Sequence, residues 1–93
     1  MDINWLRDFV CLGRTLNFTR AAEERNITQS AFSRRIRSLE NWIGVPLIDR
    51  ANYPVQLSEA GRQFLPVAQQ TVADLTDTRQ AIRERARGNA SFQ

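Results

Sequence analysis

The sequence contains no histidine and only one cysteine, Cys11. These absences exclude a Cys/His zinc site, a Ser-His-Asp triad and a Cys-His catalytic pair, because each needs residues that the chain lacks. Cys11 has no second cysteine for a disulfide and stands in an apolar helical pattern, so we interpret it as a packing residue in a reducing compartment. The sequence therefore predicts a protein that is not an enzyme and that holds no metal and no cofactor.

Lysine is also absent: all 13 basic residues are arginine, and the formal net charge is +3. Arginine binds phosphate and guanine through two N–H groups at once, which lysine cannot do. A compositional bias of the genome would also produce a lysine-free sequence. The positions of the arginines are therefore more informative than their number.

Long apolar runs are missing, since none approaches the roughly 20 residues of a membrane span. The N-terminal stretch MDINWLRDF has an acidic residue at position 2 and lacks the layout of a signal peptide. We therefore expect a cytoplasmic protein with no membrane partner. The hydrophobic fraction of 42% is typical of a folded chain, and 93 residues fit one small domain with an extended helix.

The stretch 28–43, TQSAFSRRIRSLENWI, predicts an amphipathic helix with an N-cap at Thr28. At about 100° per residue, one side of this helix is apolar. That side carries Phe32, Ile36, Leu39 and Ile43, and the opposite side carries Ser30, Ser33, Arg34, Arg37 and Asn41. An ordinary solvated surface favours Glu and Lys over short hydroxyls, so we interpret the polar side as a close-range hydrogen-bonding surface. Taken alone, the helix also fits a merely solvated arginine face.

The residues before this stretch predict two further helices. Asp2 or Asn4 can cap the first, which extends to about Leu16. The second, 18–25, leads into a tight turn in which Asn26 can take the left-handed conformation. A short helix, a tight turn and a longer basic helix make up the helix-turn-helix unit that binds DNA.

After the basic helix, Gly44 can supply a left-handed C-terminal cap, and Pro46 prevents continuation. Two short apolar runs follow, 47–50 and 55–57, and they predict a small β-hairpin, or wing. Arg50 stands near its tip, where a basic side chain can contact a sugar-phosphate backbone or enter a minor groove; an ordinary surface arginine is the alternative.

From residue 58 the pattern is helical again, to about 87. Its apolar positions recur at steps of three and four, interrupted once by arginine, which is typical of a helix that pairs with another helix. These positions are Leu65, Ala68, Val72, Leu75, Arg79, Ile82 and Ala86. Pro66 predicts either a kink or a helix that starts there. Residues 88–93 carry no periodic signal and are expected to be disordered.

The block FTRAAEERNITQSAFSRRIRSLENWIGVPLIDR, followed by VQLSEAG, resembles the N-terminal DNA-binding domain of LysR-type bacterial transcriptional regulators. The similarity covers residues 2 to about 87. The paired Ala21 and Ala22, the TQSA entry to the third helix, the SLE segment, the IGV turn and the LxxR wing all fall in the family's order. The segments FSRRIRSLE and LSEAG are most similar to those of a branch of the family that includes a hypochlorite-responsive regulator.

The resemblance implies a mainly α fold: a winged helix-turn-helix of three helices and a short β-hairpin in residues 1–57, followed by a long linker helix in 58–87. That helix would pair antiparallel with its counterpart in a homodimer, or in a tetramer of the full-length protein. Residues 88–93 would begin a hinge to an effector domain for which this chain has no residues. A small-molecule or oxidant effector would act only through that domain.

The resemblance also implies residue roles. The groove-facing, base-contacting positions match Gln29, Ser30, Ser33 and Arg34. The positions that steady the protein on the DNA backbone match Thr28, Arg37 and Arg50. Three positions depart from the family pattern: Arg25 replaces a leucine, Ile48 a phenylalanine and Ser58 a threonine, and the first two are packing positions.

Together these features predict sequence-selective binding of double-stranded DNA by a dimer, with the N-terminal end of the third helix in the major groove. The dimer contacts are expected from Leu65, Ala68, Val72, Leu75 and Ile82. The alternative is a helical protein-interaction module in which this seam carries the function and the arginine face only solubilises. Carboxylates on helix faces, such as those of Glu23, Glu24 and Glu40, are normally solvated and do not indicate an active site.

Overall fold

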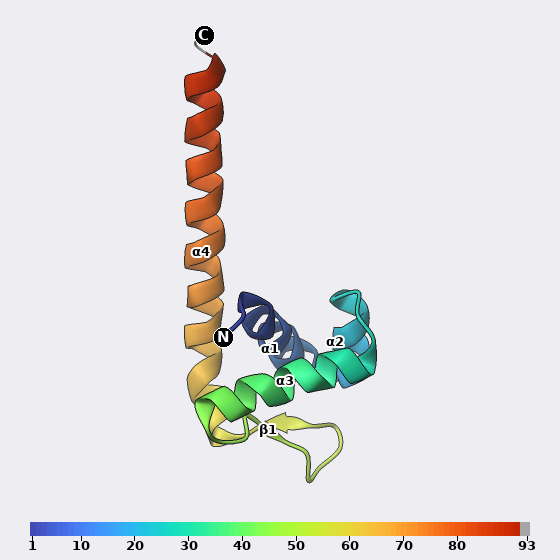
Figure 1. Cartoon of the computed structure of the whole chain (residues 1–93). Coiled ribbons are helices and arrows are strands. Elements are labelled where there is room, and N and C mark those ends of the chain that lie inside the picture. Colours follow the sequence, from blue (N-terminus) through green and yellow to red (C-terminus); the bar gives the residue numbers. More distant parts are fainter. Residues whose placement is uncertain (92–93) are drawn as a thin grey trace.

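The computed structural model describes residues 1–91, in four helices and one two-stranded antiparallel sheet. The elements are α1 (Ile3–Thr15), α2 (Phe18–Glu24), α3 (Gln29–Ile43), β1 (Ile48–Asp49), β2 (Gln56–Leu57) and α4 (Glu59–Ser91). The first three helices form a body, the strands lie beside α3, and α4 leaves the body as a long rod (Figure 1). The predicted fold, a winged helix-turn-helix followed by a long helix, is confirmed.

The helix ends follow from local hydrogen bonding. The carboxylate of Asp2 accepts from the N–H of Asn4 at 2.8 Å, so Asp2 is the cap of α1. The hydroxyl of Thr28 accepts from the N–H of Ala31 at 3.1 Å and starts α3. Gly44 ends α3 with φ +100°, a conformation that side chains disfavour. These caps are at or within one residue of the predicted positions.

The turn between α2 and α3 has the geometry that its sequence predicts. Asn26 is left-handed, with φ +58°, and the N–H of Ile27 donates to the carbonyl of Ala22 at 3.1 Å. Ala21 and Ala22 are buried, so their small side chains allow α2 to pack closely on its neighbours. The two helices of the helix-turn-helix unit are thus fixed by backbone geometry as well as by packing.

The core draws on all four helices and on the first strand. Its buried apolar members are Leu6, Phe9, Cys11, Leu12, Ala21, Ala22, Phe32, Ile36, Leu39, Leu47, Ile48 and Ala68. The rings of Phe9 on α1 and Phe64 on α4 lie 5.7 Å apart between centroids, which joins the long helix to the body. Because Gly13 has no side chain, Leu65 can approach α1 closely: a Cβ at Gly13 would lie 3.0 Å from the methyl carbons of Leu65.

The wing is a short antiparallel ladder in which Ile48 lies opposite Leu57 and Asp49 opposite Gln56. Ile48 is 2% exposed and fills the packing position where the family usually has phenylalanine. Ser58 accepts from the N–H of Gly61 at 3.0 Å and donates to the carbonyl of Pro46 at 2.8 Å. A serine therefore supplies the hydroxyl that a threonine would supply at the start of α4.

Two expectations for the long helix need correction. A helix start at Pro66 is wrong, because α4 passes through Pro66 as one continuous helix from Glu59. The expected end before Gly88 and disorder from there are also wrong as far as the structure describes the chain, because α4 continues to Ser91. One helical glycine costs only about 1 kcal/mol relative to alanine, and no proline follows. The rest of the expected tail, residues 92–93, lies outside the described residues.

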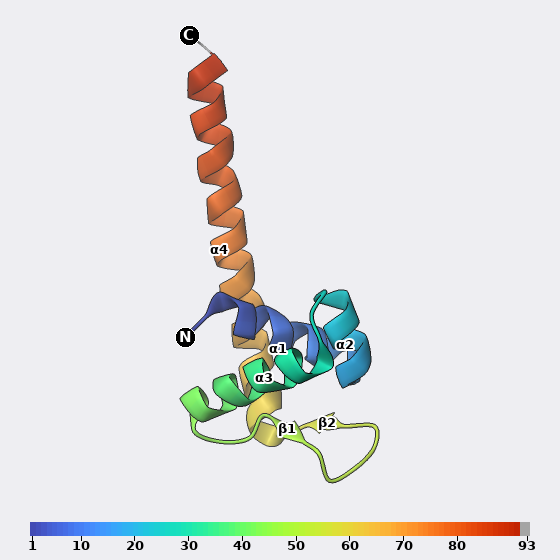
Figure 2. The same ribbon diagram turned by 45° about the vertical axis from the view of Figure 1, so that its right-hand side comes forward.

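The body and the rod give the molecule an elongated shape, with principal extents of 59, 25 and 19 Å. In two views 45° apart, the second half of α4 stands clear of the other elements (Figure 2). Within residues 1–91, no helix has the combination of length and hydrophobicity needed to span a bilayer.

Candidate nucleic-acid interface

The polar side of α3 is open to solvent, and the apolar side faces the core, with Ile43 at its end partly buried. Phe32, Ile36 and Leu39 have no exposed surface. On the other side Ser33 is partly exposed, and the exposed residues are Gln29, Ser30, Arg34 and Arg37. The two-sided helix that the sequence predicts is therefore present, with the predicted base-contacting positions on its accessible face.

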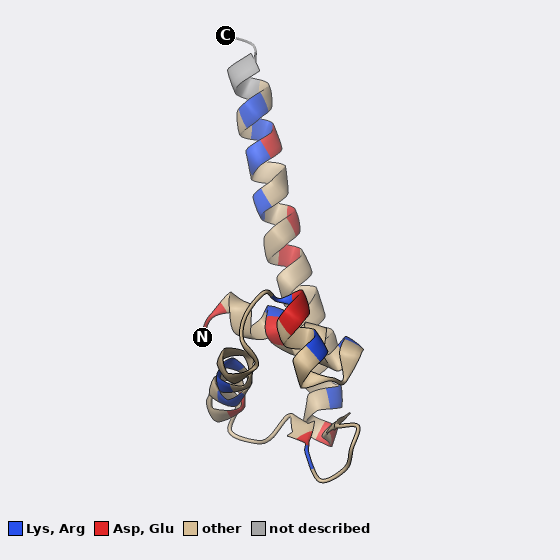
Figure 3. Cartoon of the chain, turned by 90° about the vertical axis from the view of Figure 1, so that its right-hand side faces the viewer, with Lys and Arg blue, Asp and Glu red and all other residues tan. Residues whose placement is uncertain are grey.

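A hollow of about 240 Å³ lies between α3, the start of α2 and the wing. It is lined by Phe18, Gln29, Ser33, Arg37, Arg50 and Val55. The hollow thus brings together residues predicted for base contact and residues predicted for backbone contact. Ser30 and Arg34 do not line it and face solvent elsewhere on α3. Basic positions occur on α3 and again toward the far end of α4 (Figure 3).

Gln29 is held in place by a residue from the neighbouring helix. The hydroxyl of Thr19 on α2 donates to Oε1 of Gln29 at 3.0 Å. An amide oxygen has two lone pairs, so this contact leaves one lone pair and both amide N–H groups for a further partner. No pattern in the sequence singles out Thr19. Periodicity could not reveal it, because its effect depends on how α2 crosses α3.

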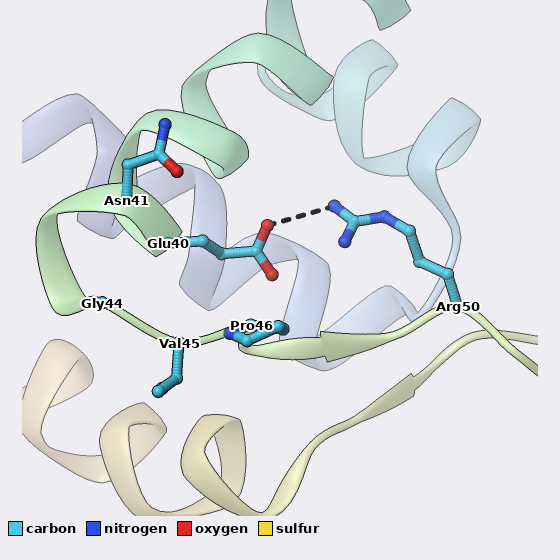
Figure 4. A pocket seen from close by; sticks show the side chains of 6 residues that line it. All are labelled: Glu40, Asn41, Gly44, Val45, Pro46 and Arg50. Carbon is cyan, nitrogen blue, oxygen red and sulfur yellow. Dashed lines mark hydrogen bonds and ion pairs between the residues drawn. The ribbon is translucent and has the colours of Figure 1, made fainter.

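Arg50 is fixed by a carboxylate and an aromatic ring. Its guanidinium donates to Oε1 of Glu40 at 3.3 Å (Figure 4) and lies 5.5 Å from the centroid of the Phe18 ring. The other oxygen of Glu40 accepts from the N–H groups of Leu47, at 2.8 Å, and Ile48, at 3.2 Å. Glu40, 9% exposed, therefore joins the end of α3 to the wing and orients Arg50.

Arg25 is not the packing residue that the family pattern suggests for its position. Its Nε donates to Oδ1 of Asp8 at 2.7 Å, and Asp8 has no exposed surface. Arg35 on α3 donates to the other oxygen of Asp8 at 3.4 Å. An ionic contact therefore takes the place of an apolar one beside the turn.

The structure divides the five residues predicted for dimerisation into two groups. Ala68 is 1% exposed and belongs to the core of this chain, and Leu65 and Val72 pack against that core. Leu75 and Ile82 are 52% and 63% exposed. The first part of the seam is therefore covered by α1 of the same chain, which leaves Leu75 and Ile82 accessible to a second copy.

Cys11 is a packed residue in the body. Its thiol lies 3.8 Å from the carbonyl oxygen of Ala21, to which it donates. Burial, and then the nearby carboxylate of Glu24, raise the pKa of the Cys11 thiol above its ordinary value of 9.0. The thiol therefore stays protonated near neutral pH and is a poor nucleophile.

The fold and the open polar face of α3 define the class of protein: a winged helix-turn-helix DNA-binding domain. Residues 3–62 match the family model described as "Bacterial regulatory helix-turn-helix protein, lysR family". The chain belongs to the LysR family of bacterial transcriptional regulators.

Individual relatives agree with this assignment. The probable cat1 operon transcriptional activator of Acinetobacter lwoffii is 45% identical over 83 residues, which make up 89% of this chain and 27% of the relative. Vibrio fischeri DarR, solved in complex with DNA, matches with a TM-score of 0.90 and 39% identity, over 94% of this chain and 30% of DarR. This chain thus spans less than a third of the length of these regulators, and neither relative is named as an enzyme.

The full-length structure of HypT from Salmonella typhimurium, a hypochlorite-specific LysR-type regulator, also matches. Its TM-score is 0.83 and its identity 41%, over 89% of this chain and 29% of HypT. Because regulators with other names match about as well, the branch to which this chain belongs stays a prediction.

Proposed function

We propose that this chain binds double-stranded DNA sequence-selectively, with the N-terminal end of α3 in the major groove. The observation that carries the proposal is the open face of α3, which continues into the hollow shared by Arg37 and Arg50. A helix fits the major groove, and a wing beside it can reach the sugar-phosphate backbone. The structure of DarR in complex with DNA supports DNA binding by this fold.

Within this mode, base recognition falls to the exposed residues at the start of α3. Gln29 keeps a free acceptor and two free donors, which suit the N7 and N6 groups of adenine. Arg34 is exposed on the same face and suits O6 and N7 of guanine. Ser30 and Ser33 tune the fit. Thr28, Arg37 and Arg50 contact the sugar-phosphate backbone of the DNA, because Thr28 lies at the N-terminal end of α3 and the cationic Arg37 and Arg50 line the hollow beside it.

The proposal includes a dimer through α4. Leu75 and Ile82 are large apolar residues of α4 that are exposed in the single chain, and burial against a second copy would remove them from water. Two copies would present two α3 helices to two half-sites. In the full-length regulator, residues 1–57 would then bind DNA and residues 58–87 would connect the subunits.

The rival function is a helical interaction module without selective DNA binding. Salt separates the two, because binding to DNA releases counterions and weakens steeply with added salt, whereas apolar helix pairing does not. A titration of duplex binding between low and physiological salt therefore discriminates between them. Binding that is absent at low salt would contradict our proposal.

The division of roles on α3 is tested with Arg34→Ala and Arg37→Ala, after selection of bound sites from random duplexes. Arg34→Ala should relax base preference at one position by about 1–3 kcal/mol. Arg37→Ala should weaken all sequences alike and reduce the slope of log K against log salt by about one. Arg83→Ala removes the same charge from the exposed end of α4 and should change neither quantity. Equal losses with unchanged preference in both α3 variants would refute the division.

A further inference from the structure

Asp8 is the most deeply buried charged side chain in residues 1–88, with no exposed surface. Its two oxygens serve two arginines: Oδ1 accepts from Nε of Arg25 at 2.7 Å, and Oδ2 accepts from Nη1 of Arg35 at 3.4 Å. Arg25 also donates to the side-chain oxygen of Asn4 at 3.4 Å. We call Asp8, Arg25 and Arg35 the Asp8 cluster.

The Asp8 cluster joins the three helices of the DNA-binding body. Asp8 lies on α1, Arg25 caps the C-terminus of α2 at the tight turn, and Arg35 lies in the middle of α3. One carboxylate therefore holds both helices of the helix-turn-helix unit to the same point on α1. The side chains of Arg25 and Arg35 are only 24% and 34% exposed, so neither is a freely solvated arginine.

Net stability does not explain such a cluster well. Removing charges from water costs about as much as their mutual attraction returns, and apolar residues of similar volume often stabilise a protein equally or better. The contacts of an ionic cluster are directional and those of an apolar cluster are not, because each N–H must point at its own oxygen. Its distinctive contribution is therefore a fixed arrangement of the helices.

We propose that Asp8 is a positioning residue for DNA recognition. Through Arg25 and Arg35 it sets the rotation and the approach of α3, and thereby which base edges Gln29 and Arg34 reach. Arg34 directly precedes Arg35 and is exposed, so anchoring Arg35 on α1 determines where its neighbour points. Binding groups must be held within roughly 0.5 Å for selective contacts, which gives a directional anchor its value. This inference depends on the proposed function.

The test replaces the cluster with apolar residues: Asp8→Leu, Arg25→Leu and Arg35→Leu together. The readout is the ratio of Kd values for the selected duplex and for duplexes changed at single base pairs. We expect this ratio to fall by about tenfold or more, comparable to the discrimination of one good base contact. The salt slope should change by less than one unit, because Arg25 and Arg35 are paired with Asp8 on α1 and are not proposed to contact phosphate.

A matched control is the ion pair between Arg14 and Glu24, which also joins α1 to α2 but is exposed and does not involve α3. The double variant Arg14→Leu, Glu24→Leu should keep the wild-type Kd ratio. A second variant, Arg35→Gln, keeps the pair of Asp8 and Arg25 and removes only the connection to α3. If the triple variant does not fold, Arg35→Gln alone tests the inference. We expect Arg35→Gln also to lower the ratio of Kd values.

Folded variants of the cluster with the wild-type Kd ratio would overturn the inference, even if their melting temperatures fall. A salt slope reduced by a full unit in Arg35→Gln would also overturn it, because Arg35 would then contact phosphate itself. If the wild-type chain showed no selective binding to any duplex, the proposed function would fail, and the inference with it. If the wild type and the triple variant are equally selective, the positioning role of Asp8 is rejected and the proposed function stands.

Discussion

The two ends of α4 have the same spacing of apolar residues, but one end packs against the core and the other is exposed to solvent. In the packed end, residues 59–73, Gly61 and Ala68 are buried, and Leu65 and Val72 pack against the core. In the projecting end, residues 74–88, every residue except Thr76 is exposed, including Leu75 and Ile82. A periodic apolar stripe therefore predicts that a helix face is covered, but not whether its own chain or a second copy covers it.

The largest effect is expected from placing a charge in the packed end of α4, where it would be buried. Ala68→Glu places a carboxylate at a site that is 1% exposed and belongs to the apolar core. We expect the free energy of unfolding to fall by about 4 kcal/mol or more, a large part of what a small domain has. Urea unfolding followed by circular dichroism measures it.

The control for this substitution is Ala81→Glu, the same change at an exposed position of the projecting end. It should alter the free energy of unfolding by no more than about 0.5 kcal/mol. Equal effects at positions 68 and 81 would mean that the packed end is not part of the core.

The next effect concerns the projecting end and its proposed partner. Leu75→Glu should leave the fold of the body intact but raise the dissociation constant of the dimer by roughly 100-fold, because each copy would bury a carboxylate in the apolar contact. Light scattering across a concentration series measures the change. Gln69→Glu adds the same charge at an exposed position away from the apolar stripe and should leave the dimer unchanged. A wild type that is monomeric at micromolar concentration would contradict the proposed dimer.

Local chemistry explains why most of the fold was predictable. The N-cap at Thr28, the left-handed end at Gly44 and the apolar side of α3 all depend on neighbours within one or two turns. The wing followed from the breaks around Pro46 and from two short apolar runs. These features place the candidate interface, since they determine which side of α3 turns away from the core.

The remaining features depend on pairs that are distant in the chain. Asp8 meets Arg25 across 17 residues and Arg35 across 27, and neither pairing has a periodic signal. Glu40 could be read only as a solvated carboxylate, because its partners are backbone N–H groups of a wing that had not yet been placed. For the same reason Ala68 was grouped with Leu75: the pattern does not reveal how far along α4 the body reaches.

The smallest expected effects use the two glycines of α4, one in each end. A Cβ at Gly61 would lie 2.1 Å from the carbonyl oxygen of Leu47, a backbone atom that cannot move without shifting the wing. Gly61→Ala should therefore lower the free energy of unfolding by about 1–3 kcal/mol. At Gly88 a Cβ would meet no atom within 4 Å, so Gly88→Ala should gain helix propensity alone, about 0.5–1 kcal/mol at most.

Thermal unfolding of the two variants distinguishes packing from propensity, because both make the same chemical change in the same helix. If only the glycine of the packed end is in close contact with the rest of the chain, Gly61→Ala should lower the melting temperature. Gly88→Ala should leave the melting temperature unchanged or raise it. Two equal gains would instead mean that the wing yields to a methyl group. The position of Arg50 on the wing would then be adjustable, and its contact with Glu40 could not hold it in place for DNA.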